Sequence, residues 1–168
     1  MSKVSIILGS DSDIDICSKA ASVLRDFDIP FEERILSAHR TPESLAAYVK
    51  EAEQKGVAVF IAIAGMSAAL PGAVAAHTTR PVIGVPVAQG SPFMGFDALL
   101  SVVQMPPGVP VAAVAVNGGL NAGLLAVSIL SVSDPRLAEK LVRYRKKQQE
   151  NVLEKDARLQ SGSGMKQS

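Results

Sequence analysis

The sequence predicts an α/β fold, a doubly wound sheet of five parallel strands covered by helices on both faces, with an extra helix at the C-terminus. Segments typical of strands and of helices alternate five times along the chain. Most strand-like segments are apolar throughout, as is typical of parallel strands buried on both faces. At 168 residues, with 48% hydrophobic residues, the chain is large enough for one domain with a substantial core.

The expected strands are short runs rich in β-branched residues, at 4–8, 31–36, 57–64, 81–87 and 111–116. Between them, apolar residues recur at the spacing of amphipathic helices. The first helix should pack through a face formed by Ile14, Cys17, Ala21 and Leu24. On the second, the shared face is Leu45, Tyr48, Val49 and Ala52.

The C-terminal third contains two further helices. Residues 121–130 are apolar on nearly every side, which predicts a helix buried in the core or at a subunit contact. Ser133-Asp134-Pro135 opens a last helix that should run to about Leu159. We expect residues 1–160 to form a single catalytic domain, followed by a disordered polar tail at 161–168.

Composition argues against several classes of function. A net charge of +1 and 4% aromatic residues favour neither nucleic-acid binding nor an acidic membrane surface. No apolar run is long and continuous enough to cross a bilayer, and the N-terminus does not resemble a signal peptide. One cysteine excludes an internal disulfide, so we expect a cytoplasmic protein whose buried Cys17 thiol is inert.

Four loops should meet at the carboxyl edge of the sheet, where ligands bind in doubly wound folds. They span residues 9–13, 37–42, 65–72 and 88–95. The second loop places His39 beside Arg40, followed by Pro42 in the first turn of a helix and Thr41 positioned to cap it. An imidazole and a fixed positive charge therefore lie at the edge where a ligand is expected.

The first two loops predict a site for a sugar phosphate or mononucleotide. Free amide groups at a helix start, the hydroxyls of Ser10 and Ser12 and the guanidinium of Arg40 suit a phosphate. A carboxylate repels a phosphate, so Asp13 is expected to accept hydrogen bonds from sugar hydroxyls instead. The competing interpretation is that the serine and aspartate residues only cap a helix, that His39 is structural and that Arg40 pairs with a nearby glutamate.

Familiar cofactor motifs are absent from the sequence. It contains no G-x-G-x-x-G, no G-x-x-x-x-G-K-[ST], no G-x-S-x-G and no Cys/His cluster with metal-ligand spacing. We therefore expect acid/base chemistry without a metal or other cofactor.

Longer motifs resemble the 5-(carboxyamino)imidazole ribonucleotide mutase family of purine biosynthesis. They are Gly9-Ser10-Asp11-Ser12-Asp13, Ser37-Ala38-His39-Arg40-Thr41-Pro42, Leu70-Pro71-Gly72, Pro81-Val82-Ile83-Gly84-Val85-Pro86, Ser101-Val102-Val103-Gln104-Met105-Pro106 and Asn121-Ala122-Gly123-Leu124-Leu125. The similarity extends from about Val4 to Leu130.

The resemblance implies a three-layer flavodoxin-like fold, a homo-octamer with sites near subunit contacts, and a mutase that needs no ATP, metal or biotin. It implies that His39 is the acid/base residue. It also implies that a loop from Gly65 to Leu70 closes over the imidazole of the substrate. The substrate would be bound by Ser10, Ser12, Asp13, Ser37, Arg40, Gly65, Ser67, Ala68 and Leu70.

Some positions differ from the family pattern. Ala69 stands where many members have histidine, and Leu120 where lysine is common. A related branch that carboxylates aminoimidazole ribonucleotide directly usually has Lys-Thr in place of Arg40-Thr41, so the arginine favours the mutase. The direct carboxylase, a non-catalytic nucleotide-binding module and a purely structural assembly protein are the alternatives.

Overall fold

The computed structural model describes the backbone of residues 3–163, which divides into two compact units. The first ends at Leu130 and contains the sheet, and the second begins at Ser131 and consists mainly of one helix. Among the described residues, no helix combines the length and apolar character needed to cross a bilayer. The expectation of a single domain over residues 1–160 stays a prediction.

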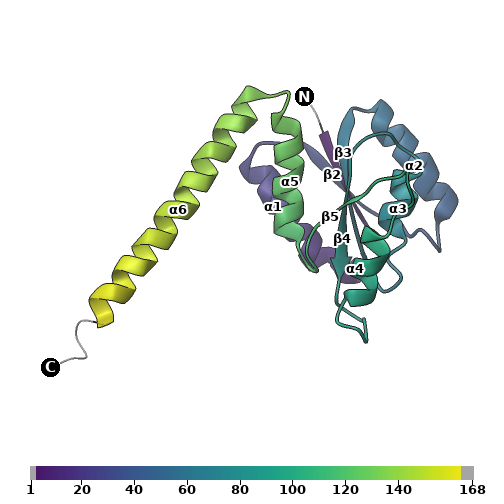
Figure 1. The fold of residues 1–168 in the computed structure, drawn as a ribbon. Helices are drawn as coiled ribbons and strands as arrows, with labels where there is room; N and C mark the ends of the chain where they lie inside the picture. The colour runs from purple at the N-terminus through teal and green to yellow at the C-terminus, as the bar shows by residue number, and fades with distance from the viewer. Residues whose placement is uncertain (1–2, 164–168) are drawn as a thin grey trace. The chain divides into compact units, whose positions relative to one another are not determined.

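Five parallel strands form the sheet of the first unit, in the order β2-β1-β3-β4-β5 (Figure 1). This is the strand order of flavodoxin-like proteins, as expected. The strands are β1 (Lys3–Leu8), β2 (Phe31–Ile35), β3 (Val57–Gly65), β4 (Val82–Val87) and β5 (Ala112–Ala113).

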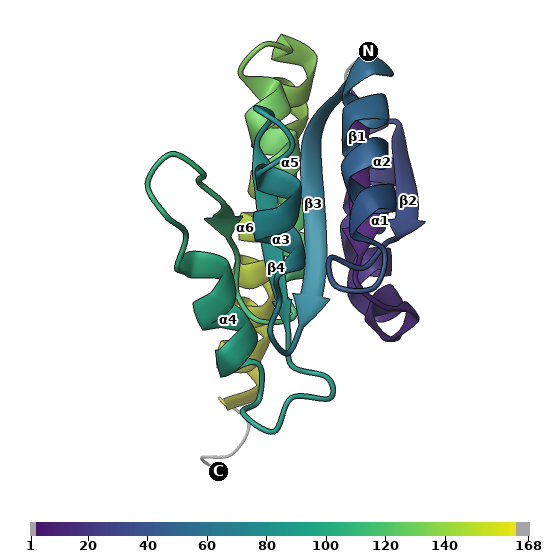
Figure 2. The same cartoon turned by 90° about the vertical axis from the view of Figure 1, so that its right-hand side faces the viewer.

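Helices cover both faces of the sheet, so the fold has three layers. Figures 1 and 2 show α1 (Ile14–Asp26) and α5 (Gly119–Ser131) on one face. On the other face lie α2 (Pro42–Gln54), α3 (Leu70–Ala75) and α4 (Phe96–Val103). Because all five strands are parallel, the loops after β1 to β4 emerge at one edge of the sheet.

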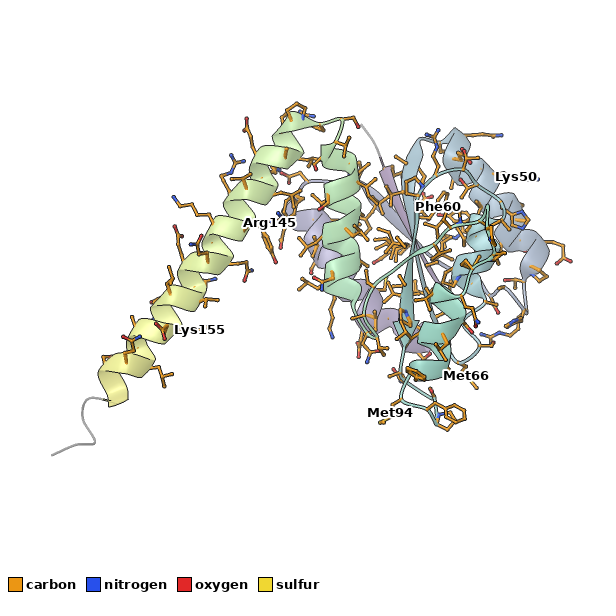
Figure 3. The ribbon with its side chains drawn as sticks, in the orientation of Figure 1. Lys50, Phe60, Met66, Met94, Arg145 and Lys155 are labelled. Carbon is orange, nitrogen blue, oxygen red and sulfur yellow. The ribbon has the colours of Figure 1, made fainter. Side chains whose placement is uncertain are left out.

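The core lies on both faces of the sheet around its central strand, β3. Residues 59–63 of β3 are completely buried, and Phe60 lies at the centre of the side chains packed on the sheet (Figure 3). The predicted core face of α2 is confirmed, because Leu45, Tyr48, Val49 and Ala52 are all buried. On α1, Ile14 is an exception: it is 51% exposed, because it lies in the first turn, beside the open edge strand β2.

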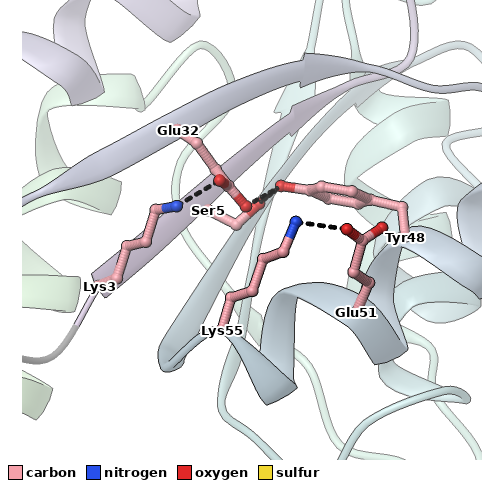
Figure 4. Close-up of polar contacts among 6 residues, drawn as sticks. All are labelled: Lys3, Ser5, Glu32, Tyr48, Glu51 and Lys55. Carbon is pink, nitrogen blue, oxygen red and sulfur yellow. Dashed lines mark hydrogen bonds and ion pairs between the residues drawn. The ribbon is translucent and has the colours of Figure 1, made fainter.

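One polar network enters this core and joins α2 to the sheet (Figure 4). The Tyr48 hydroxyl lies 2.7 Å from Oγ of the fully buried Ser5 and donates to Oε1 of Glu32 at 2.6 Å. Lys3 forms an ion pair with the same carboxylate. Burial and the Glu32 carboxylate raise the pKa of Tyr48, so its hydroxyl remains a neutral donor.

Two predicted boundaries are wrong. β5 contains only Ala112 and Ala113 instead of residues 111–116, because a proline-containing segment precedes it and Asn117, at φ 58°, turns the chain soon after it. Helix α6 (Pro135–Ser163) continues beyond Leu159, so residues 161–163 are helical where a disordered tail was expected. Side-chain pairs four residues apart, such as Gln160 with Asp156, support this last turn. The rest of the predicted tail lies outside the described residues.

Candidate active site

The loops after β1 to β4 line one cleft of about 610 Å³. Every residue predicted for the site lines it: Ser10, Ser12, Asp13, Ser37, His39, Arg40, Gly65, Ser67, Ala68 and Leu70. His39 therefore lies on the same rim of the sheet as Ser10 and Asp13, and not in the sealed interior. The position of these residues follows from the strand order, because loops after adjacent parallel strands emerge at the same edge.

The first loop is a short 3₁₀ helix, Asp11–Asp13, that leads into α1. Ser10 caps it: its Oγ accepts a hydrogen bond from the amide of Ser12 at 3.4 Å and donates to Oδ1 of Asp11 at 3.0 Å. Asp13 is buried, and Ser12 Oγ donates to its Oδ1 at 3.2 Å. Burial raises the pKa of Asp13, so an ionised carboxylate here still requires polar partners.

The guanidinium of Arg40 connects the second loop to the first. Its Nη2 donates to the carbonyl oxygen of Gly9 at 3.1 Å, and its Nε lies 3.4 Å from Ser37 Oγ, to which it donates. These contacts hold a permanent positive charge beside the start of the 3₁₀ helix. The remaining donors of the guanidinium stay available for an anion in the cleft.

Thr41 occupies the position before α2 but does not cap the helix with its side chain, which corrects the expectation. Its Oγ1 instead accepts from the amide of Ser37 at 2.9 Å and donates to the carbonyl of Ser37 at 3.1 Å. The two residues thereby close the loop that contains His39. The exposed His39 imidazole therefore lies at the tip of a short loop whose ends, Ser37 and Thr41, are hydrogen-bonded to each other.

The third loop, from Gly65 to Leu70, holds two residues in the left-handed region. Met66 has φ 54° and Ala68 has φ 37°, and the amide of Ala68 bonds to the carbonyl of Gly65 at 3.0 Å. Such a conformation costs a non-glycine residue on the order of 1 kcal/mol and is found preferentially at functional sites. Ala68 and Leu70 point inward and are buried, whereas Met66 and Ser67 are exposed at the mouth of the cleft.

Gln89 and Gly90, from the loop after β4, also line the cleft. The sequence placed their loop at this edge, but it carries no motif that would have marked these two residues as functional. Within residues 3–163, no three His, Cys, Asp or Glu side chains gather as metal ligands. Cys17 is buried, as expected, and donates to Glu33; burial and the Glu33 carboxylate raise the pKa of its thiol to about 12.

Comparison with known proteins identifies the family. An N5-carboxyaminoimidazole ribonucleotide mutase of Pyrococcus abyssi is 53% identical over 145 residues, 86% of this chain and 83% of the relative. A phosphoribosylaminoimidazole carboxylase of Candida glabrata is 51% identical over 158 residues, 94% of this chain but 28% of that longer protein. The crystal structure of Treponema denticola PurE superposes with a TM-score of 0.85 at 32% identity, covering 95% of this chain and 99% of the other. Residues 3–151 match the AIR carboxylase family model, and the chain belongs to the AIR carboxylase family.

Proposed function

We propose that this chain is an isomerase of purine biosynthesis, an N5-carboxyaminoimidazole ribonucleotide mutase. It moves a carboxylate from the exocyclic nitrogen to C4 of aminoimidazole ribonucleotide. The observation that carries the proposal is the meeting of His39, the Arg40 guanidinium and the serine-rich first loop along one cleft. The similarity over most of the chain to a relative named as this mutase supports it.

The substrate lies with its phosphate between the first loop and Arg40. The hydroxyls of Ser10, Ser12 and Ser37 and the free donors of the guanidinium surround an anion there. Asp13 accepts hydrogen bonds from the ribose hydroxyls, which supply the partners its buried carboxylate needs. The base then faces His39 and the loop from Gly65 to Leu70.

His39 serves as acid and then as base. In the first step the bond between the exocyclic nitrogen and the carboxyl carbon breaks, its electron pair stays on nitrogen, and His39 gives that nitrogen a proton. Aminoimidazole ribonucleotide and carbon dioxide result. C4 then attacks carbon dioxide, and the proton that C4 loses returns to His39. An imidazole suits both transfers because it gains and loses a proton near neutral pH.

Small apolar walls hold the carbon dioxide between the two steps. Ala64 and Ala68 are almost fully buried, and both line the cleft together with Ala69. An apolar surface offers water no hydrogen-bond partners and so keeps water away from the carbon dioxide. It therefore favours attack by C4 over escape of the carbon dioxide to solvent. The strained loop from Gly65 to Leu70 provides Ala68 and Ala69, and the end of β3 provides Ala64.

The test substitutes the two histidines separately. His39→Asn should lower mutase turnover by about 10²–10⁴-fold, the usual contribution of a positioned acid/base group. His77→Asn is the matched control, because His77 is exposed and does not line the cleft, and it should keep normal turnover. Near-normal turnover by the His39 variant would falsify the assignment.

The second candidate is direct carboxylation of aminoimidazole ribonucleotide, which the similarity to the Candida glabrata carboxylase favours. The two substrates should be assayed separately. Efficient conversion of aminoimidazole ribonucleotide with carbon dioxide, together with no reaction of the N-carboxylated substrate, would establish the carboxylase instead.

We also propose a homo-octamer in the cytoplasm, as the family resemblance implies. Large apolar side chains on the outer face of α4, Phe96, Leu100 and Val103, are exposed in the single chain and support contact with other copies. Sedimentation equilibrium measures the assembly directly, and a monomer at micromolar concentration contradicts it.

A further inference from the structure

The end of the cleft formed by the loop after β4 lies away from the phosphate position. Gln89 and Gly90 line this end. The backbone of Gln89 runs beside the third loop, because a Cβ added to Gly65 would lie 3.5 Å from the carbonyl oxygen of Gln89. Of the described residues that line the cleft after β3 and β4, only Ser67 and Gln89 have polar side chains. Gln89 has the longer side chain of the two, and it carries both donors and an acceptor.

The strand order places Gln89 toward the base of the substrate. The proposed phosphate position lies at the loop after β1, where the Arg40 guanidinium donates to the carbonyl of Gly9. β3 separates β1 from β4, and neighbouring strands are about 4.8 Å apart, so the loops after β1 and β4 start about 10 Å apart. That distance is comparable with the separation of the phosphate and the base in a mononucleotide. A nucleotide whose phosphate lies beside Arg40 therefore extends its base toward Gln89.

The loop that carries Gln89 is fixed at both ends. The amide of Ser91 donates to the carbonyl of Ala88 at 3.0 Å. Ser91 Oγ accepts from the amide of Gly95 at 3.1 Å and donates to Oδ1 of Asp97 at 2.7 Å. Gln89 thus extends from a backbone that is already in place, which lowers the entropy lost when its side chain binds a ligand.

Asn117, which follows β5, holds the start of this loop. Its Oδ1 accepts from the amide of Ala88 at 3.0 Å, and its own amide donates to the carbonyl of Pro86 at 2.8 Å. Asn117 has φ 58°, a left-handed conformation that asparagine and aspartate adopt more readily than most residues. The Asn117 side chain therefore fixes the backbone one residue before Gln89.

We propose that Gln89 binds the carboxylate that the enzyme transfers, and that Asn117 is the positioning residue for Gln89. The inference rests on the proposed function, because that function gives the substrate a carboxylate at its base end. The two N–H groups of the Gln89 amide donate to the carboxylate oxygens. A neutral amide suits this role because the carboxylate loses its charge when it leaves as carbon dioxide. A guanidinium would hold the charged group more strongly and oppose its departure.

The first experiment removes the amide donors. Gln89→Leu should raise the KM of the N-carboxylated substrate about tenfold, because a hydrogen bond to a charged group is lost, while kcat changes less than about threefold. In calorimetric titrations, the dissociation constant of aminoimidazole ribonucleotide, which has no carboxylate, should change less than about twofold. Gln89→Glu places a like charge beside the carboxylate and should raise the KM further than Gln89→Leu does.

The second experiment tests Asn117 with two variants. Asn117→Gly permits the left-handed backbone but removes the acceptor, and it should raise the same KM at least about threefold. Asn117→Asp keeps an oxygen for the Ala88 amide and should hold the KM within about twofold of the wild type. In the Gln89→Leu background, Asn117→Gly should raise the KM no further, because both residues act through one contact. Gln54→Leu is the control and should keep the wild-type KM, because Gln54 is exposed and does not line the cleft.

Each contrary result overturns a distinct claim. An unchanged KM in Gln89→Leu, with an active wild type, refutes the inference alone. An equal loss of affinity for aminoimidazole ribonucleotide means that Gln89 contacts the ring or the ribose, which refutes carboxylate binding. A KM rise in Asn117→Gly that adds to that of Gln89→Leu refutes the positioning role. A wild type that converts none of the N-carboxylated substrate refutes the proposed function, and the inference with it.

Discussion

Tyr48→Phe tests how α2 is held on the sheet, because the Tyr48 hydroxyl joins α2 to β1 and β2. The variant keeps the ring but removes a hydrogen bond to a carboxylate, which costs about 1.5–3 kcal/mol. It also leaves the hydroxyl of Ser5, at 0% exposure, without this partner, at a further cost of about 1–3 kcal/mol. We expect the free energy of unfolding to fall by about 3–4 kcal/mol.

Ser5→Ala supplies the matched comparison. It leaves the bond from Tyr48 to Glu32 intact, so it should cost about 1 kcal/mol. In the double variant no buried hydroxyl is left unpaired, so its loss should be smaller than the sum of the single losses by at least about 1 kcal/mol.

Urea unfolding followed by circular dichroism, at one fixed protein concentration, measures all three variants. Additive losses would refute the reasoning, because they would mean that the two hydroxyls do not interact in solution. A loss below about 0.5 kcal/mol for Tyr48→Phe would refute it as well, since changes of that size are typical of surface positions.

Three further predictions follow from the site and its supports. Burial raises the pKa of Asp13, so the stability that this carboxyl contributes is present at low pH and is lost as pH rises through its folded-state pKa. Asp13→Asn should therefore raise the melting temperature at pH 7 but leave it unchanged at pH 3. The same variant should weaken the binding of aminoimidazole ribonucleotide. In Gly119→Ala the new Cβ would lie 2.2 Å from the backbone oxygen of Ile16, so α1 and α5 must separate and thermal unfolding should show a loss of about 2–3 kcal/mol. Arg40→Lys replaces the fork by a point charge and should raise the dissociation constant of the nucleotide by about tenfold, but not that of the nucleoside, in calorimetric titrations.

Controls accompany these variants. An unchanged melting temperature for Asp13→Asn at pH 7 would contradict the destabilising burial of its charge. Asn121→Ala is the control for Gly119→Ala: it lies at an exposed position of α5 and should change the free energy of unfolding by less than about 0.5 kcal/mol. An equal loss of stability in Gly119→Ala and Asn121→Ala would contradict the argument that α1 and α5 pack closely at Gly119. Equal weakening of nucleotide and nucleoside by Arg40→Lys would mean that Arg40 does not hold the phosphate.

The strands and the edge that carries the site could be predicted because the signal is local. A run such as residues 57–64 is apolar at almost every position and cannot be placed except in the interior of a parallel sheet. Given the alternation of strands and helices, the right-handed crossovers alone bring Ser10, His39 and Gly65 to one edge. The sequence motifs then assign these residues to the site.

Sequence alone determined the fold class, the edge of the sheet where the site lies and the residue types placed there. Tertiary structure decided the extent of β5, the exposure of Ile14, the bond between Arg40 and Gly9, and the entry of Gln89 and Gly90 into the cleft. The reason is physical: periodicity and turn chemistry are properties of neighbours along the chain. Which groups share a cavity or a hydrogen bond depends instead on how distant segments pack, and no local pattern records it.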